Sequence, residues 1–394
     1  MSREPLVPHL AGLGTTIFAE MSALALQTGA INLGQGFPDV DGPPSVAETA
    51  VSAIREGRGN QYPPGPGVPE LRQAIAGHQR LGYGIELDPD AQVLVTAGAT
   101  EAIAAAMLAL VDSGDEVVAL EPFYDSYRAT IAMARGRCVP VRITPPDFRL
   151  DEQRLRDAVT QRTKVILLNS PHNPTGAVLS RDELEAVARV AEEHDLIVVT
   201  DEVYEHLAFD GAHVPFSTLP GMAERTLTIS SAGKMFSFTG WKIGWVTGPA
   251  VLVDAVRTTK QFLTFVSGGP FQFAVAHALD SEMAFVEGLR ESMAARRDLL
   301  TDGLASAGFE TFRPRGTYFV TTDVRSVGWD DALAFCRELP HRTGVVAVPC
   351  SVFYEDPGPA ERALVRWTFS KQETVLGEAI ARLQTHVRGT SSAP

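Results

Sequence analysis

Seven short runs of apolar and β-branched residues alternate with longer stretches of helical periodicity between about residues 90 and 250. The runs occupy residues 92–96, 116–121, 138–143, 164–169, 196–201, 226–230 and 243–248. Strand-like runs separated by helical stretches are typical of a parallel sheet with helices on both faces. Between two runs, Ser180 opens an apolar-periodic stretch and Glu183 follows three positions later, the capping-box signature of a crossover helix. The pattern therefore predicts an α/β fold with a mostly parallel seven-stranded sheet.

The pattern changes after about residue 285. One long helical stretch covers residues 284–308, and strand-like runs near Tyr318 and Val365 flank another helical stretch at 330–339. We expect a smaller α+β domain over 286–394, a large domain over 44–285, and an N-terminal arm with a small-domain segment over 1–43. The Pro/Gly-rich stretch 62–70 predicts an ordered loop, and the tail 388–394 is expected to be disordered.

Charge and composition exclude several function classes. The formal net charge is −14 and no Lys/Arg cluster exceeds a pair, so a nucleic-acid partner is not expected. No apolar run of about 18 residues and no leader-like N-terminus is visible, which favours a cytoplasmic protein without a membrane span. Cys138, Cys336 and Cys350 are widely spaced and odd in number. This predicts reduced thiols and argues against a disulfide framework or a zinc site, so no bound metal is expected.

Candidate chemistry centres on Lys234, in a segment that directly follows a strand-like run. Lysine occurs at only five positions in the chain, and here Ser231 lies three positions before Lys234 and Lys242 eight after it. A hydroxyl and a cation suit a phosphate dianion, and a nearby amine can form a Schiff base with an aldehyde. Glycines at 233, 240 and 244 would let the backbone approach a ligand closely. A solvated loop lysine is the alternative.

Three further features indicate a ligand in the same region. Asp201 ends an apolar run, where a carboxylate is costly unless paired, and α/β sheets bind ligands beyond the carboxyl ends of their strands. Gly98, Ala99 and Thr100 open a helix, so their N–H groups would face an anion. Arg366 lies among apolar residues of a predicted strand and demands an anionic partner. A helix-capping role for Asp201 and a structural salt bridge for Arg366 remain open.

Residues 230–245 resemble the lysine motif of the class I and II aminotransferases, the fold-type I enzymes that use pyridoxal 5'-phosphate (PLP). Four other blocks match this family's motifs in the same order: GATEAI at 98–103, NSPHNPTGAV at 169–178, TDEVYEH at 200–206 and VRWTFS at 365–370. The resemblance extends from about residue 30 to 385. It implies the fold-type I architecture, PLP as cofactor, and amino transfer between an amino acid and a 2-oxo acid with ping-pong kinetics.

The resemblance also implies roles for individual residues. Lys234 would hold PLP as a Schiff base and later move the substrate's Cα proton, and Asp201 would pair with the protonated pyridine nitrogen. Tyr204 and Asn173 would bond the cofactor's phenolic oxygen. The remaining cofactor contacts would come from Gly98, Ala99, Thr100, Tyr124, Ser231 and Lys242.

For the substrate, the resemblance assigns the α-carboxylate to the fork of Arg366, with Asn173 and the backbone around Gly36 nearby. Phe18 stands near the substrate, where kynurenine aminotransferases have a tryptophan, and Thr100 stands where they have a tyrosine.

Tyr62 resembles a tyrosine that reaches the cofactor phosphate of the neighbouring subunit, which implies a homodimer with shared active sites. From local sequence alone, ordinary packing remains open for Tyr62 and for Tyr124, the residue expected to stack on the cofactor ring.

Two groups within the family are similar to this chain. LGQGFPD at 33–39 and VAVPCSVFY at 346–354 resemble both the kynurenine aminotransferase/glutamine transaminase K group and the bacterial N-succinyldiaminopimelate aminotransferases of lysine biosynthesis. DGPP at 41–44 and DEVYEHL at 201–207 favour the second group, and hence N-succinyl-LL-2,6-diaminopimelate and 2-oxoglutarate as substrates. Methionine, glutamine or kynurenine is the alternative donor.

Two other classes of protein are alternatives to an aminotransferase. A PLP-dependent cysteine-S-conjugate β-lyase would use the same Asp201, Lys234 and Arg366 and differ in what leaves Cβ. An aminotransferase-like ligand sensor of a transcription regulator would need an N-terminal DNA-binding domain, for which residues 1–30 are too few and not basic.

Overall fold

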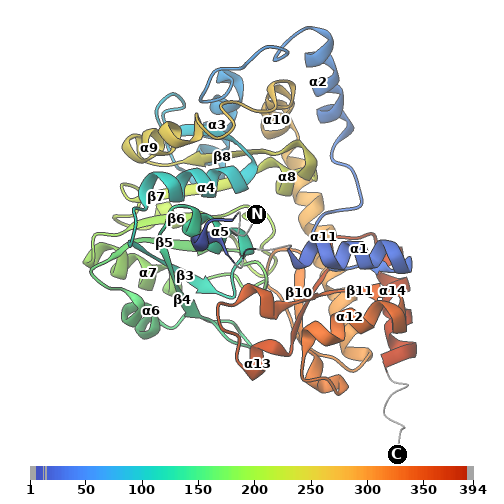
Figure 1. The fold of residues 1–394 in the computed structure, drawn as a ribbon. Coiled ribbons are helices and arrows are strands. Elements are labelled where there is room, and N and C mark those ends of the chain that lie inside the picture. The colour runs from blue at the N-terminus through green and yellow to red at the C-terminus, as the bar shows by residue number, and fades with distance from the viewer. Residues whose placement is uncertain (1–5, 12, 14–15, 388–394) are drawn as a thin grey trace, which may run out of the picture.

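The computed structural model describes residues 6–11, 13 and 16–387. Two lobes lie side by side: a large lobe built on one sheet, and a smaller lobe formed mainly by the C-terminal third of the chain (Figure 1). The N-terminal helix α1 (Ile17–Thr28) lies with the smaller lobe and contacts its helix α12 (Ala332–Thr343). The short 3-10 helix η1 (Pro8–Leu10), which precedes α1, instead contacts α5 (Asp125–Met133) of the large lobe.

The large lobe contains the seven-stranded sheet that the sequence predicts. Its order is β2-β8-β7-β6-β5-β3-β4, and only β8 runs antiparallel to its neighbours. Each strand coincides with one of the apolar runs, so the fold prediction is confirmed. The strands are β2 (Val93–Ala97), β3 (Glu116–Glu121), β4 (Arg137–Arg142), β5 (Thr163–Asn169), β6 (Ile197–Asp201), β7 (Thr226–Ser231) and β8 (Ile243–Thr247).

Helices cover both faces of this sheet because successive strand residues point to opposite sides. On β3, Val117 and Ala119 pack in the cluster that includes α4 (Gly98–Leu110), α5 (Asp125–Met133) and α9 (Ala250–Lys260). Val118 and Leu120 pack on the other face, against α6 (Glu152–Ala158) and α7 (Arg181–Glu193). The capping box is present: Ser180 Oγ accepts from the Glu183 N–H, and Glu183 accepts from the Ser180 N–H.

A third group of helices covers the β2–β8 end of the sheet. It comprises α2 (Pro44–Arg55), α3 (Pro69–Tyr83), the single turn α8 (Ala232–Met235) and α10 (Gly269–Ser281). Residues 62–68 form the expected loop, and α3 begins at Pro69, within the stretch that the sequence assigned to that loop.

The smaller lobe packs four helices around a four-stranded antiparallel sheet of order β12-β13-β10-β9. The strands are β9 (Glu310–Phe312), β10 (Phe319–Asp323), β12 (Val348–Pro349) and β13 (Leu364–Thr368). The helices are α1, α11 (Met283–Ser306), α12 and α14 (Glu373–Val387), with the short α13 (Pro359–Arg362) at the edge. β1 (Ile31–Asn32) pairs in parallel with β11 (Val345–Val346) and attaches the N-terminal segment to this lobe.

The domain boundaries at 43/44 and 285/286 stay predictions, since α11 runs unbroken across the second. The tail 388–394 lies outside the described residues. Within the described part of the chain, no helix is long and apolar enough to cross a membrane. Cys138, Cys336 and Cys350 are unpaired, the last two buried and Cys138 half-buried.

Candidate active site

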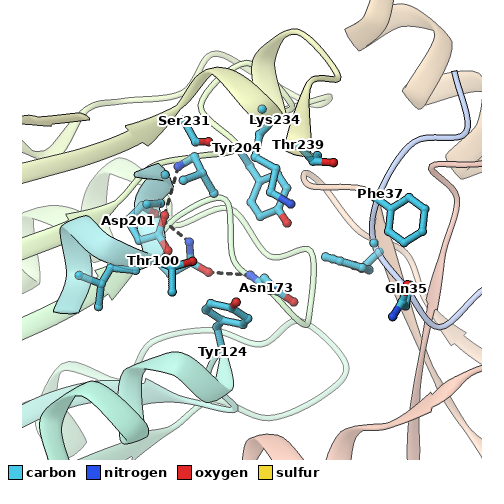
Figure 2. Close-up of a pocket in the computed structure, with 18 of the residues that line it drawn as sticks. Gln35, Phe37, Thr100, Tyr124, Asn173, Asp201, Tyr204, Ser231, Lys234 and Thr239 are labelled. Atoms are coloured by element: carbon cyan, nitrogen blue, oxygen red, sulfur yellow. Dashed lines mark hydrogen bonds between the residues drawn. The ribbon is translucent and has the colours of Figure 1, made fainter. Parts of the chain in front are cut away.

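A cavity of about 340 Å³ lies where the carboxyl ends of the large-lobe strands meet the smaller lobe (Figure 2). Every predicted site residue except Tyr62 lines it. These are Phe18, Gly36, Gly98, Ala99, Thr100, Tyr124, Asn173, Asp201, Tyr204, Ser231, Lys234, Lys242 and Arg366. Figure 2 shows Asp201, Ser231 and Lys234 on the sheet side, and Gln35 and Phe37 entering from the N-terminal segment on the other.

Asp201 is a buried carboxylate at the last position of β6. Its Oδ2 accepts a hydrogen bond from the Tyr127 hydroxyl at 2.6 Å, and its Oδ1 accepts from the Val203 N–H at 3.3 Å. Burial raises the pKa of Asp201 to about 6, although both hydrogen bonds and nearby Lys234 lower it. Asp201 thus makes the local turn contact of the capping alternative and also faces the cavity, where a bound cation would stabilise its charge.

Lys234 lies on α8, immediately beyond β7. Its Nζ donates to the Tyr318 hydroxyl at 2.6 Å, and that hydroxyl donates to the Gly36 carbonyl at 2.6 Å. No carboxylate of the described residues forms an ion pair with Lys234. The amine is therefore held in the cavity by one neutral oxygen and is not neutralised by an acid, unlike a solvated loop lysine.

The N-terminus of α4 and Lys242 form a cationic end of the cavity. Gly98 has φ +72°, a conformation that favours glycine, and it begins the helix whose first N–H groups have no intrahelical acceptor. Lys242 Nζ donates to Thr100 Oγ1 at 3.4 Å. Burial and neighbouring Lys234 lower the pKa of Lys242, although Glu101 raises it. This arrangement favours binding of a phosphate-like dianion.

The glycines of the lysine motif have different roles from those expected. A Cβ at Gly244 would lie 2.6 Å from the Gly98 carbonyl carbon, so the absent side chain makes room for α4, not for a ligand. A Cβ at Gly233 would lie 2.9 Å from Thr239 Cα, whereas one at Gly240 would meet nothing within 4 Å. The close approach predicted from sequence is therefore an approach of one protein segment to another.

Arg366, on β13, is a buried cation without an acidic partner. Its Nη1 donates to Asn173 Oδ1 and its Nη2 to the Gly34 carbonyl, both at 2.9 Å, and its Nε has no partner. The guanidinium carbon lies 3.9 Å from the centroid of the Phe319 ring. Since no carboxylate of the described residues lies within ion-pairing distance, the salt-bridge alternative is wrong. The geometry favours an external carboxylate as the missing anion.

Tyrosines form the walls between the two charged ends. Tyr204 is 3% exposed and its ring lies edge-on to Tyr318, with centroids 5.1 Å apart. Burial raises the pKa of Tyr204 well above its ordinary value, so its hydroxyl keeps its proton and can donate. Burial also raises the pKa of Tyr124 to about 12, while its hydrogen bond with Thr100 lowers it. The Asn173 N–H donates to Asn169 Oδ1 at 2.7 Å, which fixes the loop after β5.

Phe18 and Gly36 lie on the substrate side. The Arg366 guanidinium carbon is 5.1 Å from the Phe18 ring centroid. A Cβ at Gly36 would lie 2.2 Å from Phe319 Cζ, so no side chain fits at that position.

Tyr62 is the one predicted residue outside the cavity. It is 82% exposed in the loop before α3, and its ring contacts Phe265 edge-on at 5.5 Å. Its predicted contact requires a second chain, so its role stays a prediction.

Sequence reasoning missed several cavity residues: Gln35, Phe37, Ile103, Tyr127, Asn169, Val203, Thr239 and Phe319. Tyr318, which contacts Lys234, was named only as the start of a strand. A signal existed for Tyr127, which lies three residues after Tyr124, the N-cap residue of α5, and for Asn169, which ends a strand as Asp201 does. No local signal connects Tyr318 to Lys234.

The family model for aminotransferase class I and II matches residues 28–383. The chain belongs to this family. A probable N-succinyldiaminopimelate aminotransferase of Mycobacterium tuberculosis (strain H37Rv) is 54% identical over 388 residues, covering 96% of this chain and 97% of the relative. The methionine aminotransferase of Escherichia coli K12 is 41% identical over 387 residues, covering 98% and 100%.

A solved structure of the M. tuberculosis N-succinyldiaminopimelate aminotransferase aligns with a TM-score of 0.94 at 55% identity, covering 96% of this chain and 99% of that one. The enzyme is thus a fold-type I, PLP-dependent aminotransferase, which confirms the resemblance and the predicted cofactor.

The cavity fits PLP at each of its polar groups. Asp201 would pair with the ring nitrogen, Lys234 would bind the aldehyde, and the α4 N-terminus with Ser231 and Lys242 would bind the phosphate. Arg366 also lines this cavity, and its Nε has no hydrogen-bond partner. The residues present therefore fit the cofactor without rearrangement of the sheet.

Proposed function

We propose that this aminotransferase takes its amino group from N-succinyl-LL-2,6-diaminopimelate and passes it to 2-oxoglutarate, with ping-pong kinetics, in lysine biosynthesis. The donor is proposed from the relationship along the whole chain, which is closer to the M. tuberculosis N-succinyldiaminopimelate relative than to the E. coli methionine enzyme. Arg366 is the residue that supports an amino acid as substrate, because its buried guanidinium has a free Nε and no acidic partner.

Binding begins with the substrate's α-carboxylate. Arg366 would accept it as a bidentate fork, and the Asn173 amide, which already bonds Nη1, would restrict the plane of the guanidinium. Phe319 and Phe18 flank the guanidinium and exclude water from it. The Coulombic attraction is therefore stronger than it would be in solvent.

Proton transfer is assigned to Lys234. Its amine would remove the proton from the substrate Cα, and the Tyr318 hydroxyl holds that amine at one side of the cavity. When bound, PLP supplies a cationic ring that accepts the electron density left on Cα. Asp201 stabilises the positive charge on that ring, and Tyr127 keeps the Asp201 carboxylate oriented.

We also propose a homodimer whose active sites are shared through Tyr62. Support comes from exposed aromatic side chains: in a single chain Tyr62 is 82%, Phe262 83% and Phe265 49% exposed. The Phe265 ring contacts Tyr62. Aromatic residues are enriched at the centres of protein interfaces. A cytoplasmic location remains our proposal and rests on the three unpaired cysteines.

A half-reaction panel tests the donor. The PLP form is mixed with N-succinyl-diaminopimelate, methionine, glutamine, kynurenine or glutamate, and the loss of the cofactor's absorbance band is timed. We expect the succinylated donor to give the highest second-order rate constant, with Lys234→Ala as the inactive control. If that donor reacts no faster than methionine, the methionine-type alternative is favoured. Pyruvate released from a cysteine conjugate without amino transfer would instead indicate a β-lyase.

A further inference from the structure

Two histidines and a glutamate converge outside the catalytic cavity. His78 lies on α3, and Glu205 and His206 lie in the turn after β6. One ligand atom from each side chain lies within 4.8 Å of the other two, and we call these residues the His78–Glu205–His206 cluster. None of the three lines the active-site cavity, and the roles assigned above do not use them.

The two imidazoles face each other through their Nε2 atoms, which are 2.9 Å apart. At this separation one nitrogen donates and the other offers its lone pair, so at least one ring is neutral. The Gln79 amide nitrogen lies 3.4 Å from His78 Nδ1, which leaves His78 Nε2 directed at the cluster. Both Nε2 atoms can bind one metal ion when each neutral ring carries its hydrogen on Nδ1, and the Gln79 amide must then turn its oxygen toward His78 Nδ1.

Glu205 is buried, and the groups that can balance its charge are the imidazoles of His206, His78 and His213. It is 5% exposed, and no lysine or arginine of the described residues lies within ion-pairing distance of its carboxylate. Ser230 Oγ donates to Glu205 Oε1 at 2.5 Å, and Tyr83 also hydrogen-bonds this carboxylate. The neighbouring acid Glu202 differs, because His213 Nε2 lies 2.8 Å from its Oε2. A buried carboxylate beside two imidazoles can pair with a metal ion that the imidazoles also bind.

We propose that the His78–Glu205–His206 cluster binds one divalent transition-metal ion through both Nε2 atoms and a Glu205 oxygen. Two imidazoles and a carboxylate are a common ligand set for Zn²⁺, with water at the fourth position. Zinc–nitrogen bonds of about 2.0–2.1 Å in a tetrahedral site place the two nitrogens about 3.3 Å apart, so the rings need to separate by only a few tenths of an ångström. Gln79, Tyr83 and Ser230 would orient the ligands.

This site was not predicted, because the expectation of no metal rested on the spacing of the cysteines. His78 is 128 positions from His206, and only the packing of α3 on the turn after β6 brings them together. Glu205 directly follows Tyr204, so a bound ion would hold the turn that carries this cavity residue.

Calorimetric titration of the chelator-treated, PLP-loaded enzyme with ZnCl₂ tests the proposal. We expect one Zn²⁺ per chain, with His78→Gln and His206→Gln each weakening binding by about 100-fold or more. His341→Gln, which removes an exposed histidine, is the matched control and should bind like the native enzyme. With Co²⁺ as the probe, the spectrum should show ligand-field bands without thiolate charge transfer, which excludes the cysteines.

Variants that fail to fold would lose the PLP absorbance band, and crystals of the native enzyme equilibrated with ZnCl₂ then decide the question. An anomalous peak between His78 Nε2 and His206 Nε2 supports the site. The proposal is overturned by the absence of that peak, by unchanged affinity in both histidine variants, or by no binding at millimolar zinc. Each of these results would leave the cluster a hydrogen-bonded network only, and none bears on the amino donor.

Discussion

Replacing Arg366 tests whether its guanidinium recognises the substrate's α-carboxylate. In the structure both Nη atoms donate to neutral oxygens, those of Asn173 and Gly34, so no protein acid supplies the compensating charge. Removing one partner of a buried, hydrogen-bonded charge pair costs about 2–5 kcal/mol. At 1.4 kcal/mol per factor of ten, Arg366→Gln should lower kcat/KM for amino-acid donors by about 30-fold to several thousandfold.

The assay compares an amino acid with the corresponding amine that lacks the carboxylate. Half-reaction rates are followed by the cofactor's absorbance for the native enzyme, Arg366→Gln and Arg366→Lys. The ratio of the amino-acid rate to the amine rate should fall in the glutamine variant by the whole factor expected for kcat/KM. It should fall by less in the lysine variant, which keeps the charge but loses the fork. The rates with the amine should be the same in the native enzyme and in both variants.

Equal losses for the amino acid and the amine would refute this reasoning. Such a result would mean that Arg366 acts by holding the cavity together, through its contacts with Phe319 and Phe18, and not by binding the carboxylate. The PLP absorbance band and the thermal midpoint of each variant serve as controls for folding.

Two further predictions concern stability and the cofactor. The pKa of Asp201 is about 6 in the folded chain and 3.8 ordinarily, so the cofactor-free protein should lose about 3 kcal/mol of its free energy of unfolding as pH rises from about 4 to about 6. Denaturant titrations should show this loss in the native protein and not in Asp201→Asn. Parallel pH profiles of the two proteins would contradict the prediction. Gly244→Ala should lower the free energy of unfolding by about 1–3 kcal/mol and weaken PLP binding, because its Cβ would lie 2.6 Å from Gly98. In the control Gly240→Ala, whose Cβ would meet no atom within 4 Å, neither quantity should change. Equal thermal midpoints and equal PLP dissociation constants in the two variants would contradict this explanation.

Much of the fold and site was predictable because the information is local. Each strand of the large sheet is a contiguous apolar run, and Asp201 follows such a run directly. Where strands are parallel, residues that follow their carboxyl ends meet at one edge. The family's blocks are contiguous too, so Lys234, Ser231 and Lys242 could be assigned together.

What the sequence did not reveal depends on contacts between distant segments. Tyr318 lies 84 positions from Lys234, and nothing in the strand pattern around it distinguishes it from a core tyrosine. Tyr127 differs, because its contact with Asp201 joins two segments that each had a local signal. Tyr62 shows a third limit: its predicted contact belongs to another chain, and one chain leaves it exposed.

The hydrogen-bonded chain from Lys234 through Tyr318 to Gly36 couples cofactor loading to the substrate loop. When Lys234 holds PLP, the Tyr318 hydroxyl would no longer accept a hydrogen bond from the free amine. It would still donate to the Gly36 carbonyl. The Gly36 loop would then lose one of its indirect links to the large lobe and keep two others: the Tyr204 ring against Tyr318, and Arg366, which bonds both Gly34 and Asn173. By reciprocity, whatever draws the Gly36 loop and Tyr318 away from Lys234 also frees the amine for the cofactor, so the two events share one free-energy term.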